Sequence, residues 1–208
     1  MTEMEAVETK EDQDLLVPRN EYLKAGIHVG TKFKTKYMSD FIYETRADGL
    51  SVMNVQKIND RIKIAAKFLS RFNPEDIIVV ARREHAWRAI KKFGKAMGCT
   101  IFAGRYPPGI MTNPNLKNYI EPKVLIVTDA KVDKNAVFDA IKIGIPVIAL
   151  SDTNNEANFV DLVLPCNNKG KKSIALVYWI LAREYMKIKG LIKSDDEFKE
   201  KLEDFVGE

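Results

Sequence analysis

The chain has 208 residues, of which 46% are hydrophobic and 30% are charged, and its formal net charge is +4. This size and composition predict one domain with a substantial core rather than two full domains. No apolar stretch approaches the roughly 20 residues that a membrane-spanning helix needs, and the acidic N-terminus lacks the apolar segment of a secretory signal. Two cysteines, Cys99 and Cys166, are too few for a disulfide framework and indicate a reducing cytoplasm.

The charge is divided unevenly along the chain. Residues 1–14 and residues 194–208 each carry a net charge of −5, which leaves +14 on residues 15–193. A basic body between acidic ends indicates a polyanionic partner, although lysines and arginines on solvated helix surfaces would give the same count. We therefore expect a disordered acidic tail (1–14), a single α/β domain (15–193) and an acidic C-terminal tail or short helix (194–208).

The body begins with a short helix and a hairpin. Asn20 is expected to cap a helix that runs to Ala25. Two β-rich runs, residues 41–44 and 50–55, lie on either side of an Asp-Gly pair at 48–49. Because Asp-Gly favours tight turns, these runs predict a β-hairpin with a connection somewhat longer than the two-residue ideal.

From residue 57 onward, helical and strand patterns alternate. The helical segments repeat apolar residues every three or four positions, whereas the strand segments are continuous apolar runs, as expected of strands buried on both faces. Helices are predicted over residues 57–71, 84–97, 133–143 (capped by Asp133), 174–188 and, within the acidic end, 195–206. Strands are predicted over residues 76–81, 100–103, 124–128, 146–150 and 160–164. The alternation predicts a doubly wound, Rossmann- or flavodoxin-like parallel sheet with helices on both faces, to which the N-terminal hairpin and flexible acidic tails are added.

One loop between a strand and a helix has the layout of a phosphate-binding loop. Residues 165–173 read Pro-Cys-Asn-Asn-Lys-Gly-Lys-Lys-Ser. A helix N-terminus offers free backbone N–H groups and the positive end of the helix dipole. The pattern G-x-x-x-x-G-K-[ST] fails twice, because Pro165 replaces the first glycine and Lys172 replaces the hydroxyl residue that binds Mg²⁺. The loop therefore favours a phosphate that belongs to RNA rather than to a nucleoside triphosphate.

Enzymatic and metal-binding patterns are weak. The chain has no G-x-G-x-x-G motif, and the turn after strand 76–81 carries large charged side chains that would obstruct a dinucleotide. Asp129 and Asp152 follow strands as phospho-acceptors or metal ligands do, but aspartate there is common as a turn or helix cap. His28 and His85 have no further ligand at metal spacing. We predict no catalytic residue, cofactor, metal site or small-molecule substrate.

Basic residues cluster at several points of the predicted fold. The loops after the strands of a parallel sheet gather at one edge, so several of these clusters are expected to meet. Together they favour RNA binding, in which the protein neutralises phosphates and recognises folded shape. Tyr106 either stacks on a base or packs in the protein, and Asn167 and Asn168 either contact RNA or brace their turn. The expected RNA-binding residues are Lys32, Lys34, Lys36, Arg82, Arg83, Arg88, Arg105, Tyr106, Asn113, Asn167, Asn168, Lys169, Lys171 and Lys172.

Six stretches of the sequence, taken in order, resemble one known family. They are residues 25–31, 42–50, 104–109 together with 112–114, 128–130, 144–153 and the loop 165–173. Together they resemble the universal small-subunit ribosomal protein family conventionally numbered two, and the resemblance covers residues 15–189.

The resemblance implies a doubly wound α/β domain that is not a catalyst. It implies binding to small-subunit ribosomal RNA beside neighbouring ribosomal proteins, in the cytoplasm and not at a membrane. Bacterial members carry a long helical insertion where this chain has only residues 115–123, and the long C-terminal extension of eukaryotic members is absent, so the archaeal type is expected. Two alternatives stay open, namely a nucleotide-binding enzyme of the same fold and an interaction module outside the ribosome.

Overall fold

The computed structural model describes residues 15–198 and 200–207, so the predicted disordered tail 1–14 lies outside the described residues. The helices are α2 (Arg19–Ala25), α3 (Val55–Leu69), α4 (Glu84–Met97), α5 (Lys134–Ile143), α6 (Lys171–Ile188) and α7 (Leu202–Val206). Shorter 3₁₀ segments are η1 (Tyr37–Phe41), η2 (Pro74–Asp76) and η3 (Asp195–Glu197). The strands are β1 (Ile42–Thr45), β2 (Ser51–Met53), β3 (Ile77–Ala81), β4 (Thr100–Ala103), β5 (Val124–Val127), β6 (Val147–Ser151) and β7 (Leu162–Pro165).

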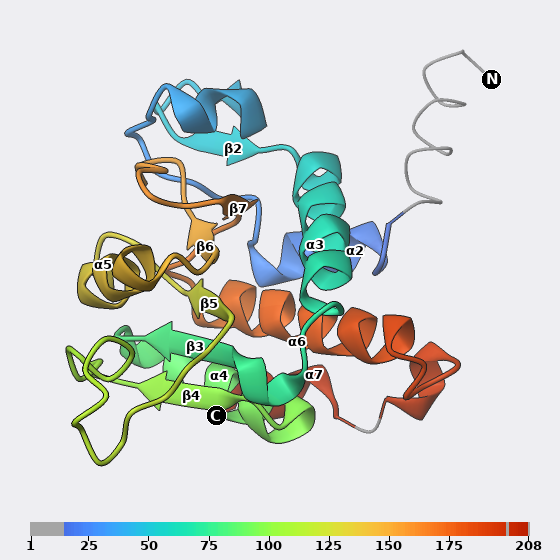
Figure 1. Cartoon of the computed structure of the whole chain (residues 1–208). Coiled ribbons are helices and arrows are strands. Elements are labelled where there is room, and N and C mark those ends of the chain that lie inside the picture. Colours follow the sequence, from blue (N-terminus) through green and yellow to red (C-terminus); the bar gives the residue numbers. More distant parts are fainter. Residues whose placement is uncertain (1–14, 199, 208) are drawn as a thin grey trace.

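Strands β3 to β7 form one parallel sheet in the order β4-β3-β5-β6-β7 (Figure 1). Strand β3 pairs with β4 on one side and with β5 on the other, so the direction in which the chain crosses the sheet reverses between β3 and β5. The predicted parallel sheet is confirmed. In open α/β sheets such a reversal opens a crevice at the carboxyl ends of the strands, which is the usual place for a ligand.

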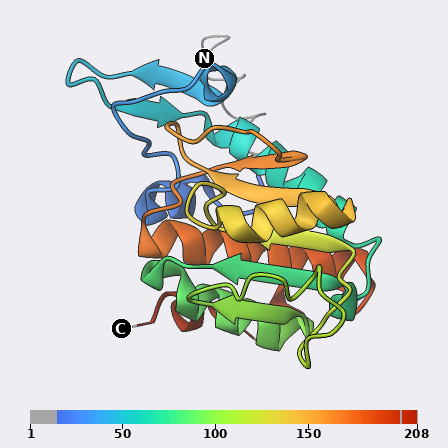
Figure 2. The ribbon, with the colours of Figure 1, turned by 60° about the vertical axis from the view of Figure 1, so that its left-hand side comes forward.

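Helices cover both faces of the sheet, but unequally. On one face α3, α4 and α6 pack together against alternate strand residues such as Ile77 and Val79. On the other face α5 and the loop 104–120 cover the intervening residues, including Ile78 and Val80. Figure 2 shows α5 on one side of the sheet and α6 on the other. Adjacent strand residues point to opposite faces, which explains why the strands read as continuous apolar runs.

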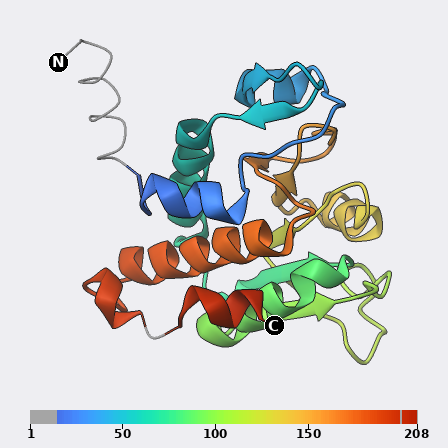
Figure 3. The same cartoon turned by 180° about the vertical axis from the view of Figure 1, so that it is seen from behind.

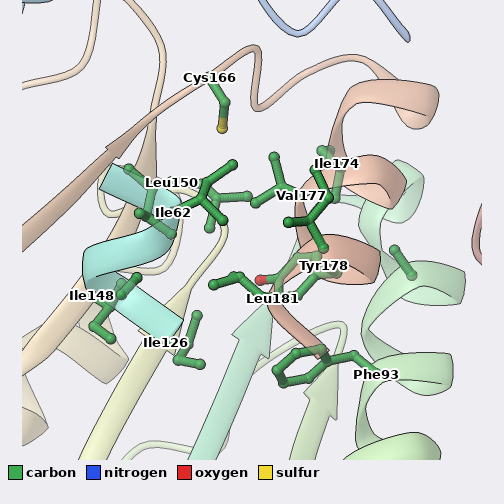
Figure 4. Close-up of a cluster of buried hydrophobic side chains, with 14 of the residues drawn as sticks. Ile62, Phe93, Ile126, Ile148, Leu150, Cys166, Ile174, Val177, Tyr178 and Leu181 are labelled. Carbon is green, nitrogen blue, oxygen red and sulfur yellow. The ribbon is translucent and has the colours of Figure 1, made fainter. Parts of the chain in front are cut away.

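The larger core lies between α6 and the sheet (Figure 4). Tyr178 of α6 is fully buried, and its ring packs edge-on against Phe93 of α4 with 5.2 Å between the centroids. Its hydroxyl shares a 2.9 Å hydrogen bond with the hydroxyl of Thr128, just after β5. Burial raises the pKa of the Tyr178 hydroxyl. A buried ring whose polar end is satisfied fixes α6 against the carboxyl end of β5.

The predicted hairpin is confirmed as the antiparallel pair β1–β2, which is separate from the main sheet. The chain that enters it passes close to two other segments at Gly30. The Gly30 N–H donates to the carbonyl oxygen of Ser51 at 3.0 Å, and a Cβ added at Gly30 would lie 2.5 Å from Cγ2 of Thr153. Only glycine permits this approach, so Gly30 holds the hairpin segment against the loop that follows β6.

Two helix caps differ from the predictions. Pro18, not Asn20, precedes the first turn of α2. Asp133 stands at the N-cap position of α5, but its side chain does not cap that helix. Instead, Oδ1 of Asp133 accepts a 3.0 Å hydrogen bond from the backbone N–H of Arg82. The carboxyl group therefore connects the start of α5 to the end of β3, because it accepts from the N–H of Arg82 rather than from an N–H in the first turn of α5.

The acidic C-terminal segment, expected as a flexible tail or a short helix, contains the short helix α7, which packs on α4 and α6 (Figure 3). Phe205 is buried, and Nε1 of Trp179 donates to the carbonyl oxygen of Glu200 at 2.8 Å. Nε of Arg88 donates to the carbonyl oxygen of Asp204 at 3.3 Å. This segment is therefore docked on the domain over the residues that are described.

Candidate nucleic-acid interface

The loops that follow the parallel strands meet at the carboxyl edge of the sheet, as the topology predicts. Ala81, the last residue of β3, lies opposite Ala103, the last residue of β4, so the segments that begin at Arg82 and Gly104 emerge together. The N–H of Thr128 donates to β3, which brings the segment after β5 beside them. The loops after β6 and β7 continue the same edge.

Two buried aspartates organise this edge. Oδ2 of Asp129 accepts a 2.5 Å hydrogen bond from the guanidinium group of Arg83, and its Oδ1 accepts one from Asn155 at 2.9 Å. Asp152 forms a 3.0 Å ion pair with Nζ of Lys169. Buried carboxylates stay ionised only when they are paired and hydrogen-bonded. Arg83 and Lys169, both predicted to bind RNA, therefore also serve as the counter-charges of the edge.

Asn155 and Asn168 connect the two aspartates. Oδ1 of Asn155 accepts from the backbone N–H of Asp152 at 3.0 Å and from Nδ2 of Asn168 at 3.2 Å. Nδ2 of Asn168 also donates to the carbonyl oxygen of Leu150 at 3.1 Å. Asn168 is fully buried and braces the loop, which is one of the two roles that the sequence left open for it.

Asn167 explains why the loop 165–173 is not an open phosphate-binding loop. Its Oδ1 accepts hydrogen bonds from the backbone N–H groups of Lys169 and Gly170, both at 3.0 Å. Its Nδ2 donates to the carbonyl oxygen of Gly26 at 3.3 Å. Consecutive loop N–H groups of this kind are the donors that a bound phosphate would use. Here the side-chain amide oxygen of Asn167 accepts these hydrogen bonds in place of an anion.

The segment 31–36 is bound to the same edge although it lies far away in the sequence. The N–H of Thr35 donates to the carbonyl oxygen of Thr153 at 2.9 Å, and the N–H of Thr31 donates to the hydroxyl of Thr153 at 2.9 Å. Phe33, in the middle of the segment, is 79% exposed. Three exposed lysines are thereby placed beside the strand ends: Lys32, Lys34 and Lys36.

Arg82 and Arg105 are exposed and line one hollow of about 260 Å³ at the reversal point of the sheet. Tyr106 also lines this hollow, but only 4% of its surface is exposed. Its ring packs edge-on against Phe102 at 5.8 Å, and its hydroxyl donates to Oδ2 of Asp139 at 3.2 Å. Tyr106 therefore packs in the protein, which is one of the two roles that the sequence left open for it.

Other predicted residues lie elsewhere. Arg88 and Lys172 line a groove of about 580 Å³ beside α7, together with the acidic residues Glu203 and Asp204. Asn113 is exposed, and its Oδ1 accepts a 3.1 Å hydrogen bond within its own loop. Lys171 is half-buried in the first turn of α6. The predicted set is thus divided among the carboxyl edge, this acidic groove, the loop of Asn113 and the first turn of α6.

Sequence reasoning missed the polar network behind the edge. Its members come from loops that are far apart in the chain, and a single sequence does not report such pairs. Asp129 and Asp152 were recognisable only as aspartates that follow strands, and Asn155 and Thr153 carried no signal beyond turn composition.

The rest of the described chain offers little reactive chemistry. It holds no group of three or more His, Cys, Asp or Glu side chains placed to bind a metal ion. None of its helices is both long and apolar enough to cross a membrane. Burial raises the pKa of the free thiol of Cys99 to about 12, and burial together with the charge of Arg46 lowers the pKa of His28. A thiol with a raised pKa is a poor nucleophile. Fold and site define a doubly wound α/β protein with a basic carboxyl edge.

Comparison with known proteins identifies the family. The sequence matches the family described as ribosomal protein S2 over residues 22–121 and 115–187. It is 49% identical to the small ribosomal subunit protein uS2 of Thermoplasma acidophilum over 93% of this chain and 98% of that protein. It is 49% identical to the protein of the same name from Nanoarchaeum equitans, over 92% of this chain and 96% of that protein. It is 46% identical to the one from Saccharolobus solfataricus, over 99% of this chain and 91% of that protein.

The chain belongs to the ribosomal protein S2 family, which confirms the resemblance found in the sequence. It is a ribosomal protein of the archaeal type, and the alternative of a nucleotide-binding enzyme is wrong.

Proposed function

We propose that this chain is a structural constituent of the small ribosomal subunit and binds its RNA through the carboxyl edge of the sheet. Family membership supports the ribosomal role, and the relatives are named as small-subunit proteins. The observation that carries the proposal is that segment 31–36 and the loops after β3 and β4 bring exposed basic side chains to one edge: Lys32, Lys34, Lys36, Arg82 and Arg105.

The mechanism is phosphate neutralisation by a preformed surface. Basic side chains at the spacing of phosphates release counterions and fix the orientation of the protein, whereas the shape of the folded RNA supplies the selectivity. The buried network around Asp129 and Asp152 keeps the loops in place before RNA arrives, so less conformational entropy is lost on binding.

Lys169 also belongs to this proposed surface. Its ammonium group donates to Asp152 at 3.0 Å and to Asn154 at 3.1 Å, and its side chain is 37% exposed. An ammonium group has three donors, so one is left for a phosphate. Arg83 has 31% of its side chain exposed and can contribute in the same way.

Further contacts are proposed away from the edge. Arg88, Lys171, Lys172 and the exposed turn at Asn113 would form a secondary contact with RNA. For Arg88 and Lys172, the nearby Glu203 and Asp204 offset part of the positive charge, so these two contribute less than the edge. Neighbouring small-subunit proteins are proposed as further partners on the basis of family membership.

The test compares two triple variants that lose the same charge. One replaces Lys32, Lys34 and Lys36 with Ala. The control replaces Lys67, Lys95 and Lys142, which are exposed in the last turns of α3, α4 and α5 and therefore lie at the opposite, amino edge. Binding to a fragment of small-subunit RNA is measured over a series of salt concentrations.

The edge variant is expected to bind more weakly, with a log–log salt slope that is shallower by about 0.7–0.9 for each phosphate that the protein no longer neutralises. The control is expected to keep the slope of the natural protein. Equal changes in both variants would mean that binding depends on net charge and not on the carboxyl edge.

A further inference from the structure

A third buried carboxyl group, that of Asp133, lies beside the network around Asp129 and Asp152. Asp133 is only 4% exposed, and its Oδ1 accepts from the N–H of Arg82. Its Oδ2 is buried and has no hydrogen-bond partner anywhere in residues 15–198 and 200–207. A buried polar atom without a partner is costly and rare, so its presence marks a place where a ligand can supply the missing partner.

Asp133 lines the same hollow as Arg82 and Arg105. The hollow lies where the strand order reverses, and α5 begins at the next residue with no side chain capping its first turn. Two guanidinium groups and an uncapped helix N-terminus are groups that favour phosphate. At about 260 Å³ the hollow is smaller than the roughly 300–1,000 Å³ of pockets for drug-sized ligands, so it suits a phosphate with part of its nucleotide and not a whole cofactor.

We propose that this hollow is a subsite for one nucleotide phosphate, held by Arg82 and Arg105, with the hydroxyl of protonated Asp133 donating a further hydrogen bond to a phosphate oxygen. The assignment rests on the proposed RNA-binding function and adds to it a defined site. The phosphate comes from an RNA chain; a free mononucleotide and inorganic phosphate are the other sources of the same chemistry.

The groups around Asp133 decide its protonation. Arg82 faces it from the end of β3, Asp129 with its partner Arg83 from the end of β5, Arg105 from the loop after β4, and Tyr178 from α6. Burial raises the pKa of Asp133 to about 7; the hydrogen bond from Arg82 opposes this rise and the charge of Asp129 adds to it. Well below that pH the group is largely uncharged and does not repel a phosphate. Ionisation above that pH both removes the donor and adds repulsion.

The test measures binding of a single-stranded RNA tetranucleotide to the full chain by calorimetric titration at two pH values. A phosphodiester keeps one charge over this range, so a change in affinity reports the protein. Affinity is expected to be about tenfold lower near pH 8 than near pH 6, because Asp133 is mostly ionised one unit above its pKa. Asp133→Asn is expected to bind equally at both pH values, which separates the effect of this carboxyl group from that of other groups in the protein.

Two further variants test the arginines, both of which are exposed, so that their replacement is expected to leave the fold intact. Arg82→Gln and Arg105→Gln are each expected to weaken binding about tenfold near pH 6, the usual loss for one charged hydrogen bond. Lys95→Gln removes one charge at the amino edge and is expected to leave the affinity unchanged.

Several outcomes would overturn the subsite. A natural protein with equal affinity at both pH values would do so, as would arginine variants that bind no more weakly than Lys95→Gln. In either case, binding of the larger RNA fragment through segment 31–36 would still support the proposed function. Stronger binding of cytidine monophosphate or inorganic phosphate than of the tetranucleotide would contradict RNA as the source.

Discussion

At the carboxyl edge, the side-chain amide oxygen of Asn167 lies where a bound anion would lie in a phosphate-binding loop. The side chain accepts from two successive loop N–H groups, and the Cβ that any other residue would add at Gly170 would lie 3.2 Å from Nδ2 of Asn167. A phosphate-binding loop and the loop 165–173 both present free backbone N–H groups before a helix. This shared feature explains why the sequence of the loop resembles a phosphate-binding loop. The lysines around the loop are then available to hold the edge or to contact RNA.

Replacing Asn167 with Ala is expected to lower stability and to leave RNA affinity nearly unchanged. Two loop N–H groups lose their acceptor, which costs about 0.5–2 kcal/mol by analogy with the loss of a helix cap. Urea unfolding measures the loss, and RNA titration of the folded variant measures affinity. Asn113→Ala removes a similar bond from an exposed turn and serves as the control for the unfolding measurement alone, because that turn is itself proposed to contact RNA. An unchanged free energy of unfolding with a large loss of affinity would show instead that Asn167 contacts RNA.

At the scale of elements, α4 packs closely against β4 because Gly94, at the contact, has no side chain. A Cβ at Gly94 would lie 2.6 Å from Cγ2 of Ile101 and 3.3 Å from the carbonyl oxygen of Cys99. Gly94 is in the interior of the helix, where alanine is normally the better residue by about 0.5–1 kcal/mol. Close packing against the strand is therefore preferred over helix propensity at this position.

Gly94→Ala is expected to destabilise the protein despite this helical preference. Overpacking of a tight core typically costs about 1–3 kcal/mol, which exceeds the gain in propensity. Thermal or urea unfolding checks the sign, and Lys91→Ala on the exposed side of α4 controls for the effect of alanine on the helix. A more stable Gly94→Ala variant would mean that α4 can move away from β4 at little cost.

The elements themselves could be predicted from the sequence, and their caps and contacts could not. Apolar periodicity and continuous apolar runs located the helices and strands from α3 to α6 to within a few residues, because burial on one or two faces dictates both patterns. Asp133 had the position of a helix cap, but the N–H of Arg82 competes for its carboxyl oxygen once β3 lies beside it. The burial and hydrogen bonds of Tyr106 and Asn168 likewise depend on residues that are distant in the chain, such as Asp139 and Leu150.

At the scale of the whole molecule, the arrangement of charge divides the surface into two parts. The carboxyl edge exposes lysines and arginines from the N-terminal segment and from the loops after β3 and β4. The face formed by α4, α6 and α7 carries the docked acidic segment, where Lys92 and Glu200 pair at 3.5 Å and the backbone of Asp204 accepts from Arg88. A polyanion is therefore attracted to one side of the molecule, which orients the protein as it binds.

The most direct measurement of this orientation is crosslinking at nucleotide resolution in the assembled small subunit. We expect crosslinks between ribosomal RNA and the carboxyl edge, at segment 31–36 and at the positions of Arg82 and Arg105. We expect none at the amino edge, in the C-terminal turns of α3, α4 and α5 around Lys67, Lys95 and Lys142. Crosslinks confined to the latter positions, with the carboxyl edge unmarked, would contradict the account.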